Sequence, residues 1–530
     1  MSETIGAGPA PAPRKGLLLA FLCFGVFMVY LDATIVNVAL PNIQHELTAG
    51  ITQLQWIVDA YALAFACLLL TSGTLGDILG RKKLFLGGLI GFTLSSVMCA
   101  LAGSIGVLLV GRALQGICGS VMIPVSLALV SAAYTEPAAR ARAIGIWAGI
   151  GGVALSAGPV AGGVLVDHVG WQSIFWINVP IGVLAALVLA RLLTENRSPR
   201  ARQLDLAGQA LFIVAIATLA YALIEGNSRG WASALIVGSF VLSAVTLVLF
   251  VFWELRRPDP MLPLKLFRSP VVAVAGAVNF LSLFGLFAAI FLLTLVLQSL
   301  QGLSSVETGV RFLALTVPIM IASFAASVVA AKAGSRRPIV VGSVLSAAGL
   351  YGLTALDVNT GFGGYWWALA LLGVGVSFTG APATVALLGS VPPEQAGTAS
   401  GISNTFRQVG AVFGVALAGA LLLRHLRDAL PGALSAAPLP QQVRDRAYDQ
   451  LSGGDLSQAG TLPPGMRGTV MDAVGPVFID GMHLVMEVAA AGTLVGGLCA
   501  LVFLRRGGGD AAPKQAEAAQ PEAAMGRRQG

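Results

Sequence analysis

The chain has 530 residues, of which 56% are apolar and only 11% are charged, and its formal net charge is +7. Soluble globular proteins contain about 25% charged residues, so a chain this poor in charge is not expected to cover a water-facing surface. The 65 glycines and the low aromatic content are typical of an α-helical membrane protein, in which small residues let helices approach closely.

Taken in chain order, the sequence contains stretches of about 20 mainly apolar residues, the length that crosses a bilayer as an α-helix. Fourteen such spans are predicted: residues 16–38, 53–75, 84–103, 106–131, 142–166, 174–193, 205–225, 231–254, 271–298, 306–331, 338–356, 363–390, 398–423 and 481–504. We therefore expect an all-α integral membrane protein. The N-terminal segment 1–15 and the tail 506–530 lie outside these spans, and the composition of the tail predicts disorder.

The basic residues predict the orientation, because Lys and Arg are enriched in cytoplasmic loops. If the N-terminus is inside, most of the 32 basic residues fall on inner segments, and the short outer loops hold only Arg229. We expect a multi-pass protein of the inner (cytoplasmic) membrane with both termini in the cytoplasm. The polar segment 424–480 is predicted to be a long external loop with room for a short amphipathic helix.

No catalytic or metal-binding pattern emerges from the sequence. The five cysteines lie in apolar segments without metal-type spacing, and the four histidines form no ligand set. The 424–480 loop holds no catalytic constellation. We therefore expect neither an enzyme, nor a bound metal, nor a cofactor.

Two loops resemble one another. GTLGDILGRKK (73–83) follows the second span and AAKAGSRRP (330–338) follows the tenth, and each places a glycine before a basic pair. Their positions indicate two six-helix halves, 16–193 and 271–505, separated by a 194–270 segment that holds two extra spans. Repeated halves with a site between them are typical of secondary transporters.

The 73–83 loop carries Gly73-x-Leu75-x-Asp77-x-x-Gly80-Arg81-Lys82, and on this motif the chain resembles the major facilitator superfamily. Fourteen spans are similar to its drug:proton antiporter family. Three further motifs of that family match LDATIVNVALP (31–41), RALQG (112–116) and GPVAGG (158–163), whereas Ile78 stands where the loop motif often has arginine. The resemblance implies proton-driven efflux of lipophilic drugs or antibiotics by alternating access, powered by the proton motive force. The implied partners are the bilayer, a lipophilic small molecule and protons, with no nucleic acid, and the chain is expected to work as a monomer.

Asp32 is a carboxylate within the first span, where a charge costs about 2.5–3.5 kcal/mol on insertion scales. In the resembling fold the first and fourth helices both line the central cavity, so Asp32 and Arg112 are expected to communicate. One interpretation is proton coupling, in which Arg112 stabilises the charged carboxylate in one conformation only. The alternatives are a permanent ion pair that fixes helix packing, or direct binding of a cation.

The 73–83 loop and the GPVAGG stretch each have a conformational interpretation. Gly73 and Gly80 would allow close helix contact and a tight turn, and Asp77 would reach helix amides or Arg142 and so latch the cytoplasmic side. Arg81 and Lys82 would at least orient the protein. In the fifth span, a bend and a flattened helix face would seal one half against proton leak, although small-residue packing without functional meaning is the alternative. The residues concerned are Gly158, Pro159, Gly162 and Gly163.

Arg407 is a further charge within a span, and it is expected to meet either Glu225 or an acidic group of the substrate, with structural pairing equally open. Glu307 and Arg311 are expected to form a surface pair four residues apart. Aromatic faces and weak polar groups suit a lipophilic guest. On that ground the expected substrate contacts are Tyr30, Asn37, Gln115, Trp147, Asn279 and Gln408.

Other functions remain open at this point. The chain could be a dedicated exporter of one secondary metabolite, or a proton-coupled metabolite symporter, although GPVAGG and the two extra spans argue against a symporter. A channel should show a regular polar stripe along its pore, and a receptor should show a folded sensor domain. Neither pattern is visible in the sequence.

Overall fold

The computed structural model describes residues 12–195, 203–392, 395–456, 458, 462–463 and 465–504. Within these residues, fourteen helical segments are long and apolar enough to cross a membrane. Each overlaps one of the predicted spans, so the all-α fold and the number of spans are confirmed. Residues 1–11 and the tail predicted to be disordered lie outside the described part of the chain.

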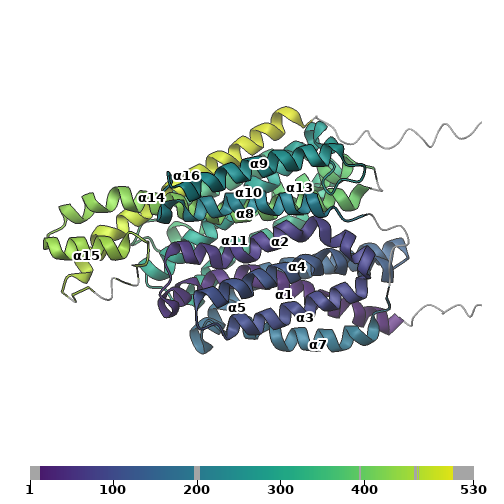
Figure 1. Ribbon diagram of the computed structural model, residues 1–530, viewed down its shortest axis with the longest axis horizontal. Helices are drawn as coiled ribbons and strands as arrows, with labels where there is room; N and C mark the ends of the chain where they lie inside the picture. The colour runs from purple at the N-terminus through teal and green to yellow at the C-terminus, as the bar shows by residue number, and fades with distance from the viewer. Residues whose placement is uncertain are drawn as a thin grey trace, which may run out of the picture.

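The N-terminal half contains six spans (Figure 1), the last of them formed by two helices in succession. Its helices are α1 (Ala12–Leu47), α2 (Ile51–Leu79), α3 (Arg81–Ala100), α4 (Ile105–Ala133), α5 (Pro137–Val169), α6 (Ser173–Trp176) and α7 (Asn178–Leu192). The start of α1 lies at the face of the bundle that we name the terminal face, because the end of the last helix lies there too (Figure 1). The opposite face is the distal face.

The C-terminal half repeats this arrangement. Its helices are α10 (Pro270–Leu295), α11 (Ser305–Ala333), α12 (Arg336–Gly352), α13 (Trp366–Gly389), α14 (Ala396–Ala436), α15 (Gln441–Leu451) and α16 (Arg467–Phe503). Helix α10 ends in a π-helical turn over Val296–Leu300. In the N-terminal half α1 packs on α5, α2 on α4 and α3 on α7; in the C-terminal half α10 packs on α14, α11 on α13 and α12 on α16. The two halves are therefore copies of one packing scheme.

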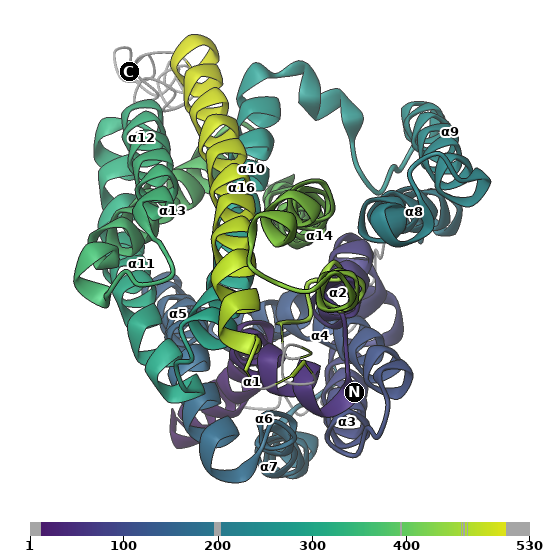
Figure 2. The same ribbon diagram turned by 90° about the vertical axis from the view of Figure 1, so that its left-hand side faces the viewer.

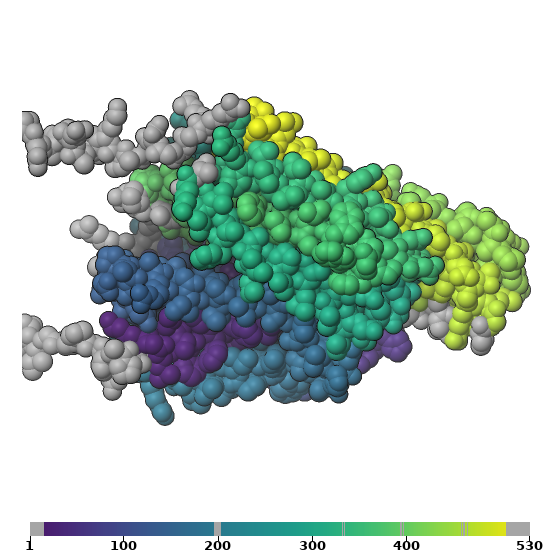
Figure 3. Space-filling view, turned by 180° about the vertical axis from the view of Figure 1, so that it is seen from behind, coloured from purple at the N-terminus to yellow at the C-terminus, as the bar shows by residue number. Residues whose placement is uncertain are grey.

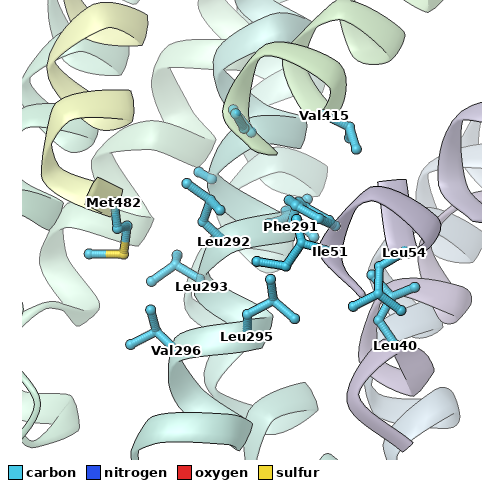
Figure 4. Packing of buried hydrophobic residues seen from close by; sticks show 14 of the residues in the cluster. Leu40, Ile51, Leu54, Phe291, Leu292, Leu293, Leu295, Val296, Val415 and Met482 are labelled. Atoms are coloured by element: carbon cyan, nitrogen blue, oxygen red, sulfur yellow. The ribbon is translucent and has the colours of Figure 1, made fainter. Parts of the chain in front are cut away.

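The halves meet through corresponding helices. α2 packs against α14, and its counterpart α11 packs against α5, the counterpart of α14. Figure 3 shows α5 and α11 side by side on one face. Between the halves, side chains of α1 and α2 such as Leu40, Ile51 and Leu54 share a hydrophobic cluster with Phe291, Val415 and Met482 of the other half (Figure 4).

The two extra spans form a hairpin beside this bundle. It consists of α8 (Leu206–Arg229) and α9 (Ala234–Arg256). Helix α8 contacts α2 and α14, whereas α9 packs mainly on α8 and stands at the edge of the molecule (Figure 2). At the terminal face, Asp205 caps α8 by accepting the Gly208 N–H at 3.0 Å and forms an ion pair with Arg257 at 3.4 Å. This ion pair fastens the two ends of the hairpin together.

The prediction of a long loop over 424–480 was wrong. Helix α14 continues through this segment to Ala436, and α16 begins at Arg467, well before the predicted span at 481. Together with α15 they form a helical extension beyond the distal face (Figure 1). Buried leucines at Leu426, Leu430 and Leu434 recur at helical spacing and give the extension an apolar core. The short helix expected within this segment is confirmed as α15.

Candidate functional site

An ion pair between Asp32 of α1 and Arg112 of α4 lies inside the N-terminal half. The Nη1 of Arg112 donates to Asp32 Oδ2, and both side chains are almost completely buried. The second carboxylate oxygen, Oδ1, accepts hydrogen bonds from Gln115 Nε2 at 3.2 Å and Asn178 Nδ2 at 3.4 Å. The expected neighbourhood of Asp32 and Arg112 is thus present, and each charge is compensated.

The groups around Arg112 also come from the N-terminal half. Its Nε donates to the Ile57 carbonyl oxygen at 3.1 Å, and its Cζ lies 4.4 Å from the centre of the Tyr61 ring. A Cβ on Gly116 would lie 2.3 Å from the Tyr61 carbonyl oxygen, so this glycine of the RALQG motif lets α4 approach α2. Gln115, predicted as a substrate contact, instead accepts from Arg112 Nη1 at 2.9 Å and belongs to the ion-pair cluster.

A second constellation lies where the two halves meet. Tyr30 of α1 faces α5, since a Cβ on Gly151 would lie 3.0 Å from its ring. Trp147 lies one helical turn before Gly151 and packs on the same hydrophobic cluster as Tyr30. Arg407 of α14, from the other half, is close enough to Tyr30 to interact with it electrostatically. We name Tyr30, Trp147 and Arg407 the interhalf site.

Arg407 does not meet Glu225, so that expected contact was wrong. Glu225 lies at the distal end of α8, where it accepts from Trp56 Nε1 at 3.0 Å and pairs with Arg229 at 3.2 Å. Within the described residues, Arg407 forms no ion pair and no hydrogen bond. Its unpaired nitrogens remain accessible to solvent. An intramembrane charge of this kind faces a water-filled space or a ligand.

The remaining predicted contacts occupy separate places. Asn37 and Asn279 are fully buried, and each leaves its Oδ1 without a hydrogen-bond partner among the described residues. Asn279 Nδ2 donates to Ser403 Oγ at 3.1 Å, whereas Trp147 Nε1 donates to Ser126 Oγ at 3.0 Å. Gln408 lies on the stripe of α14 that faces α2, between the contacts made by Gly401 and Val412.

The GPVAGG stretch joins the two halves at the distal side of the bundle. A Cβ on Gly158 or Gly162 would collide with Thr34 or Ile35 of α1, which agrees with the predicted flat helix face. Gly163 lies against α11, because a Cβ there would lie 2.4 Å from the Ser305 carbonyl oxygen. The Pro159 carbonyl group abuts Gly309 of α11. The motif therefore closes the junction between the halves as well as packing within one half.

The same two helices separate toward the terminal face. Nearest that face, Gly145, Gly149 and Gly152 of α5 have open space where a Cβ would be placed. On α11 the Phe324 side chain is 79% exposed. The distal junction is closed in this conformation, whereas α5 is uncovered at these glycines toward the terminal face.

Comparison with known proteins assigns the family. Residues 22–415 match the family model described as Major Facilitator Superfamily. The chain is a member of the major facilitator superfamily. It is 35% identical over 519 residues to the tetracenomycin C resistance and export protein of Streptomyces glaucescens, covering 96% of each chain. It is 36% identical over 478 residues to the multidrug resistance protein Stp of Mycobacterium tuberculosis, covering 88% of each chain.

Other relatives and solved structures agree. This facilitator is 32% identical over 421 residues to the methylenomycin A resistance protein of Streptomyces coelicolor, covering 79% of this chain and 88% of the relative. Its fold resembles that of a bacterial homologue of the human lysosomal transporter Spinster, with a TM-score of 0.65 and 14% identity over 93% of this chain and 98% of that one. A peptide transporter of the POT family matches with a TM-score of 0.61 at 14% identity, over 93% and 97% of the two chains.

The signature loop of this facilitator makes different contacts from those predicted. Asp77 pairs with Arg81 at 2.8 Å and not with Arg142, which is exposed. Gly73 is also exposed and touches no other helix, so its expected close contact was wrong. Gly80 does make the tight turn, with a φ of 103° that favours glycine.

The loop holds the last helix of its half. Lys82 Nζ donates to the carbonyl oxygens of Ala190 and Leu193 at 2.8 and 2.6 Å, at the C-terminal end of α7. A cation at this position interacts favourably with the helix dipole. In the other half, Arg336 Nη2 donates to the Leu501 carbonyl oxygen near the end of α16. The two similar loops therefore perform the same packing task in this facilitator.

Sequence reasoning missed two carboxylates. Asp59 of α2 is fully buried, and neither of its oxygens has a hydrogen-bond partner among the described residues. Asp167 of α5 accepts the backbone N–H groups of Ser305 and Val306 at 3.1 and 2.9 Å, and so binds the first turn of α11 across the halves. The signal for Asp59 was available, because it is a single acid within an apolar span. Across the described part of this facilitator, no three His, Cys, Asp or Glu side chains lie together as a metal site requires.

The surface pair expected four residues apart on α11 was also wrong. Glu307 accepts the Ser304 N–H at 2.9 Å and completes the capping box at the start of the helix. Arg311 donates instead to Tyr365 Oη at 2.9 Å and to Gln301 Oε1 at 3.3 Å.

Proposed function

We propose that this facilitator exports lipophilic drugs or antibiotics in exchange for protons, by alternating access and without a cofactor. The observation that carries the proposal is the placement of Asp32 and Tyr30, two residues apart on α1. Asp32 points into the ion-pair cluster of the N-terminal half, and Tyr30 packs on Gly151 of α5, within the electrostatic reach of Arg407 from the other half. A single helix therefore touches the proton-binding group and the space for the substrate.

The proton step follows from the contacts of Asp32. Three side chains donate to its carboxylate, and all of them favour the charged form. Protonation removes the anion that compensates Arg112, which must then find another partner or water. Because α1 also packs on GPVAGG of α5, a change in the ion pair is transmitted to the distal junction. Proton binding and opening of the distal side thereby become linked.

The orientation and location are part of the proposal. The terminal face is cytoplasmic, the distal extension is external, and the protein lies in the cytoplasmic membrane, as the distribution of Lys and Arg indicates. The conformation described here is then open to the cytoplasm. The interhalf site is assembled from a single chain, which supports function as a monomer.

The names of the relatives favour export of antibiotics, and some of them name a single compound. A dedicated exporter of one secondary metabolite is therefore the second candidate. A panel of susceptibilities separates the two, in a host with few pumps of its own. Multidrug export raises the inhibitory concentration of several unrelated drugs, whereas a dedicated exporter raises that of one class.

Proton coupling is tested in everted membrane vesicles with an imposed pH gradient. A drug to which the protein confers resistance should release protons from vesicles that contain the wild-type protein and not from those that contain Asp32→Asn. Resistance without drug-induced proton movement would overturn the coupling, and no resistance to any drug in the panel would overturn the efflux function.

A further inference from the structure

Within the described residues, the interhalf site holds one cation that no acid compensates. Among the described residues Arg407 has no ion pair, and its side chain is half-buried within a membrane span. The charge of Arg112 is neutralised by Asp32 within the N-terminal half. The electrostatic potential at the interhalf site is therefore positive.

The other acids of the bundle are engaged or placed elsewhere. Glu225 lies at the distal end of α8 with Arg229, and Asp167 binds backbone amides at the start of α11. Glu254 lies at the terminal end of α9, where it accepts the Leu262 N–H at 3.2 Å. Within the described residues the carboxyl group of Asp59 is sealed from solvent and forms neither a hydrogen bond nor an ion pair.

The position of Arg407 makes it available to a guest. It lies on α14 between the contacts that this helix makes with α10 of its own half and with α2 of the other half, and so borders the junction that must open and close. The neighbouring stripe of α14 is occupied by contacts with α2, and a third stripe packs through Gly410 and Gly414 on the backbone of α10. The guanidinium is thus held by the packing of its own helix, while its five N–H donors stay free for an acceptor.

From this we infer that the interhalf site selects substrates with an acidic group, such as a carboxylate, a phenolate or an enolate on an aromatic or polycyclic body. Arg407 binds the anion, and Tyr30 and Trp147 contact the apolar rings. A planar guanidinium matches a carboxylate or a pair of neighbouring oxygens better than an ammonium group does. Lipophilic cations are repelled at the same position. This inference rests on the proposed function and adds the chemical class of its substrate.

Binding of three matched probes to the purified full-length protein tests the inference. Dansylglycine is an anion, its methyl ester is neutral, and dansyl-ethylenediamine is a cation on the same fluorophore. We expect the wild-type protein to bind the anion about tenfold or more tightly than the ester, the factor that one hydrogen bond to a charged group contributes, and the cation most weakly. Equal affinities for the three probes, no binding of the anion, or a preference for the cation would overturn it.

Substitutions assign the preference to Arg407. Arg407→Gln should remove the tenfold advantage of the anion and leave the affinity for the ester within about twofold, whereas Arg407→Lys should keep part of the advantage. The matched control is Arg424→Gln, because the Arg424 side chain is 72% exposed on the distal extension. A preference that persists in Arg407→Gln, or that disappears in Arg424→Gln, would overturn the assignment. If Arg407→Gln does not fold, the assignment is decided by comparing the affinities of the three probes for the wild-type protein with those for Arg407→Lys.

Transport distinguishes this inference from the proposed function. If a pH gradient drives transport of the neutral ester but the anion has no advantage, the inference fails and the proposed function stands. If the anion is preferred but no probe moves with the pH gradient, the proposed function fails and the assignment of the binding site stands.

Discussion

Asp32 and Arg112 neutralise one another in a compartment built entirely from the N-terminal half, and helix α1, which carries Asp32, also carries Tyr30 of the interhalf site. We expect Asp32→Asn to lose transport driven by a pH gradient and to keep substrate binding, because the amide preserves the shape of the side chain and cannot exchange a proton. Gradient-driven transport and equilibrium binding in proteoliposomes measure the two properties separately. Asp428→Asn is the matched control, since that side chain is 73% exposed on the distal extension. If Asp32→Asn transports normally, coupling moves to the sealed carboxyl group of Asp59.

The alternative of a purely structural ion pair makes a different prediction for Arg112. Arg112→Ala leaves a buried carboxylate without its partner, and removing one member of a buried pair costs about 3–5 kcal/mol. The double variant Asp32→Asn/Arg112→Gln should recover most of this stability because no buried charge remains. Thermal unfolding in detergent measures the recovery. A static pair predicts that transport recovers together with stability, whereas proton coupling predicts that the double variant stays inactive.

The distal junction is tested through Gly163. A Cβ at this position would lie 2.4 Å from the Ser305 backbone oxygen, so Gly163→Ala should force α5 and α11 apart at their distal ends. We expect the conformational equilibrium to shift toward the state that is open at the distal side, with loss of most transport. Labelling of an Asn42→Cys probe by an impermeant maleimide should increase, because Asn42 donates to Ser305 Oγ in the closed junction. Gly152→Ala is the control on the same helix, since open space surrounds it; equal labelling in both variants would contradict the role of Gly163.

The turn between α2 and α3 depends on Gly80. At a φ of 103°, an L-residue with a side chain is strained by about 1–3 kcal/mol. A Cβ would also displace the Glu195 carboxylate, which accepts the Lys82 backbone N–H at 3.1 Å. We therefore expect Gly80→Ala to lower the unfolding temperature and to loosen the end of α7. Gly87→Ala, on α3 with nothing around it, should leave the unfolding temperature unchanged or raise it slightly. A Gly80→Ala protein as stable as the wild type would show that the turn tolerates a side chain.

The charge of the substrate has a consequence for the driving force. Exchange of one proton for a neutral molecule moves one elementary charge across the membrane, and exchange for a monovalent anion moves two. Each charge contributes about 2.3 kcal/mol per 100 mV. Export of dansylglycine should therefore respond to an imposed membrane potential about twice as steeply as export of its methyl ester. Equal voltage dependence in proteoliposomes would show that the anion is carried in its protonated form.

The membrane-spanning part of the fold could be predicted because the bilayer imposes a length and a composition on every helix. The distal extension could not be predicted in the same way. Helices α14 and α16 become polar on one side where they leave the membrane, so their continuous apolar stretches end there. The signal that was missed is periodic and lies in the spacing of Leu426, Leu430 and Leu434.

Only the part of the site that family motifs specify could be predicted from the sequence. Motifs placed Asp32 and Arg112 on helices that pack together, and the structure joins them. The partners of Arg407 and Asp77 depend on the rotation of each helix about its axis, which neither hydropathy nor motif order determines. Glu225 was the acid expected to meet Arg407, and Arg142 was the base expected to meet Asp77. In the structure Asp77 pairs with Arg81 of its own loop, and Arg407 pairs with no acid among the described residues.

Helix α14 has 41 residues and runs without a break from the terminal face to the tip of the extension, a length of about 60 Å at 1.5 Å per residue. Arg407 lies in its first third, so the remainder is a lever arm of about 40 Å beyond the interhalf site. A tilt of about 10° at Arg407 would carry Ala436 through roughly 7 Å. A small movement at Arg407 is thereby magnified into a displacement at the tip of the distal extension, where a fluorophore would report each transport cycle.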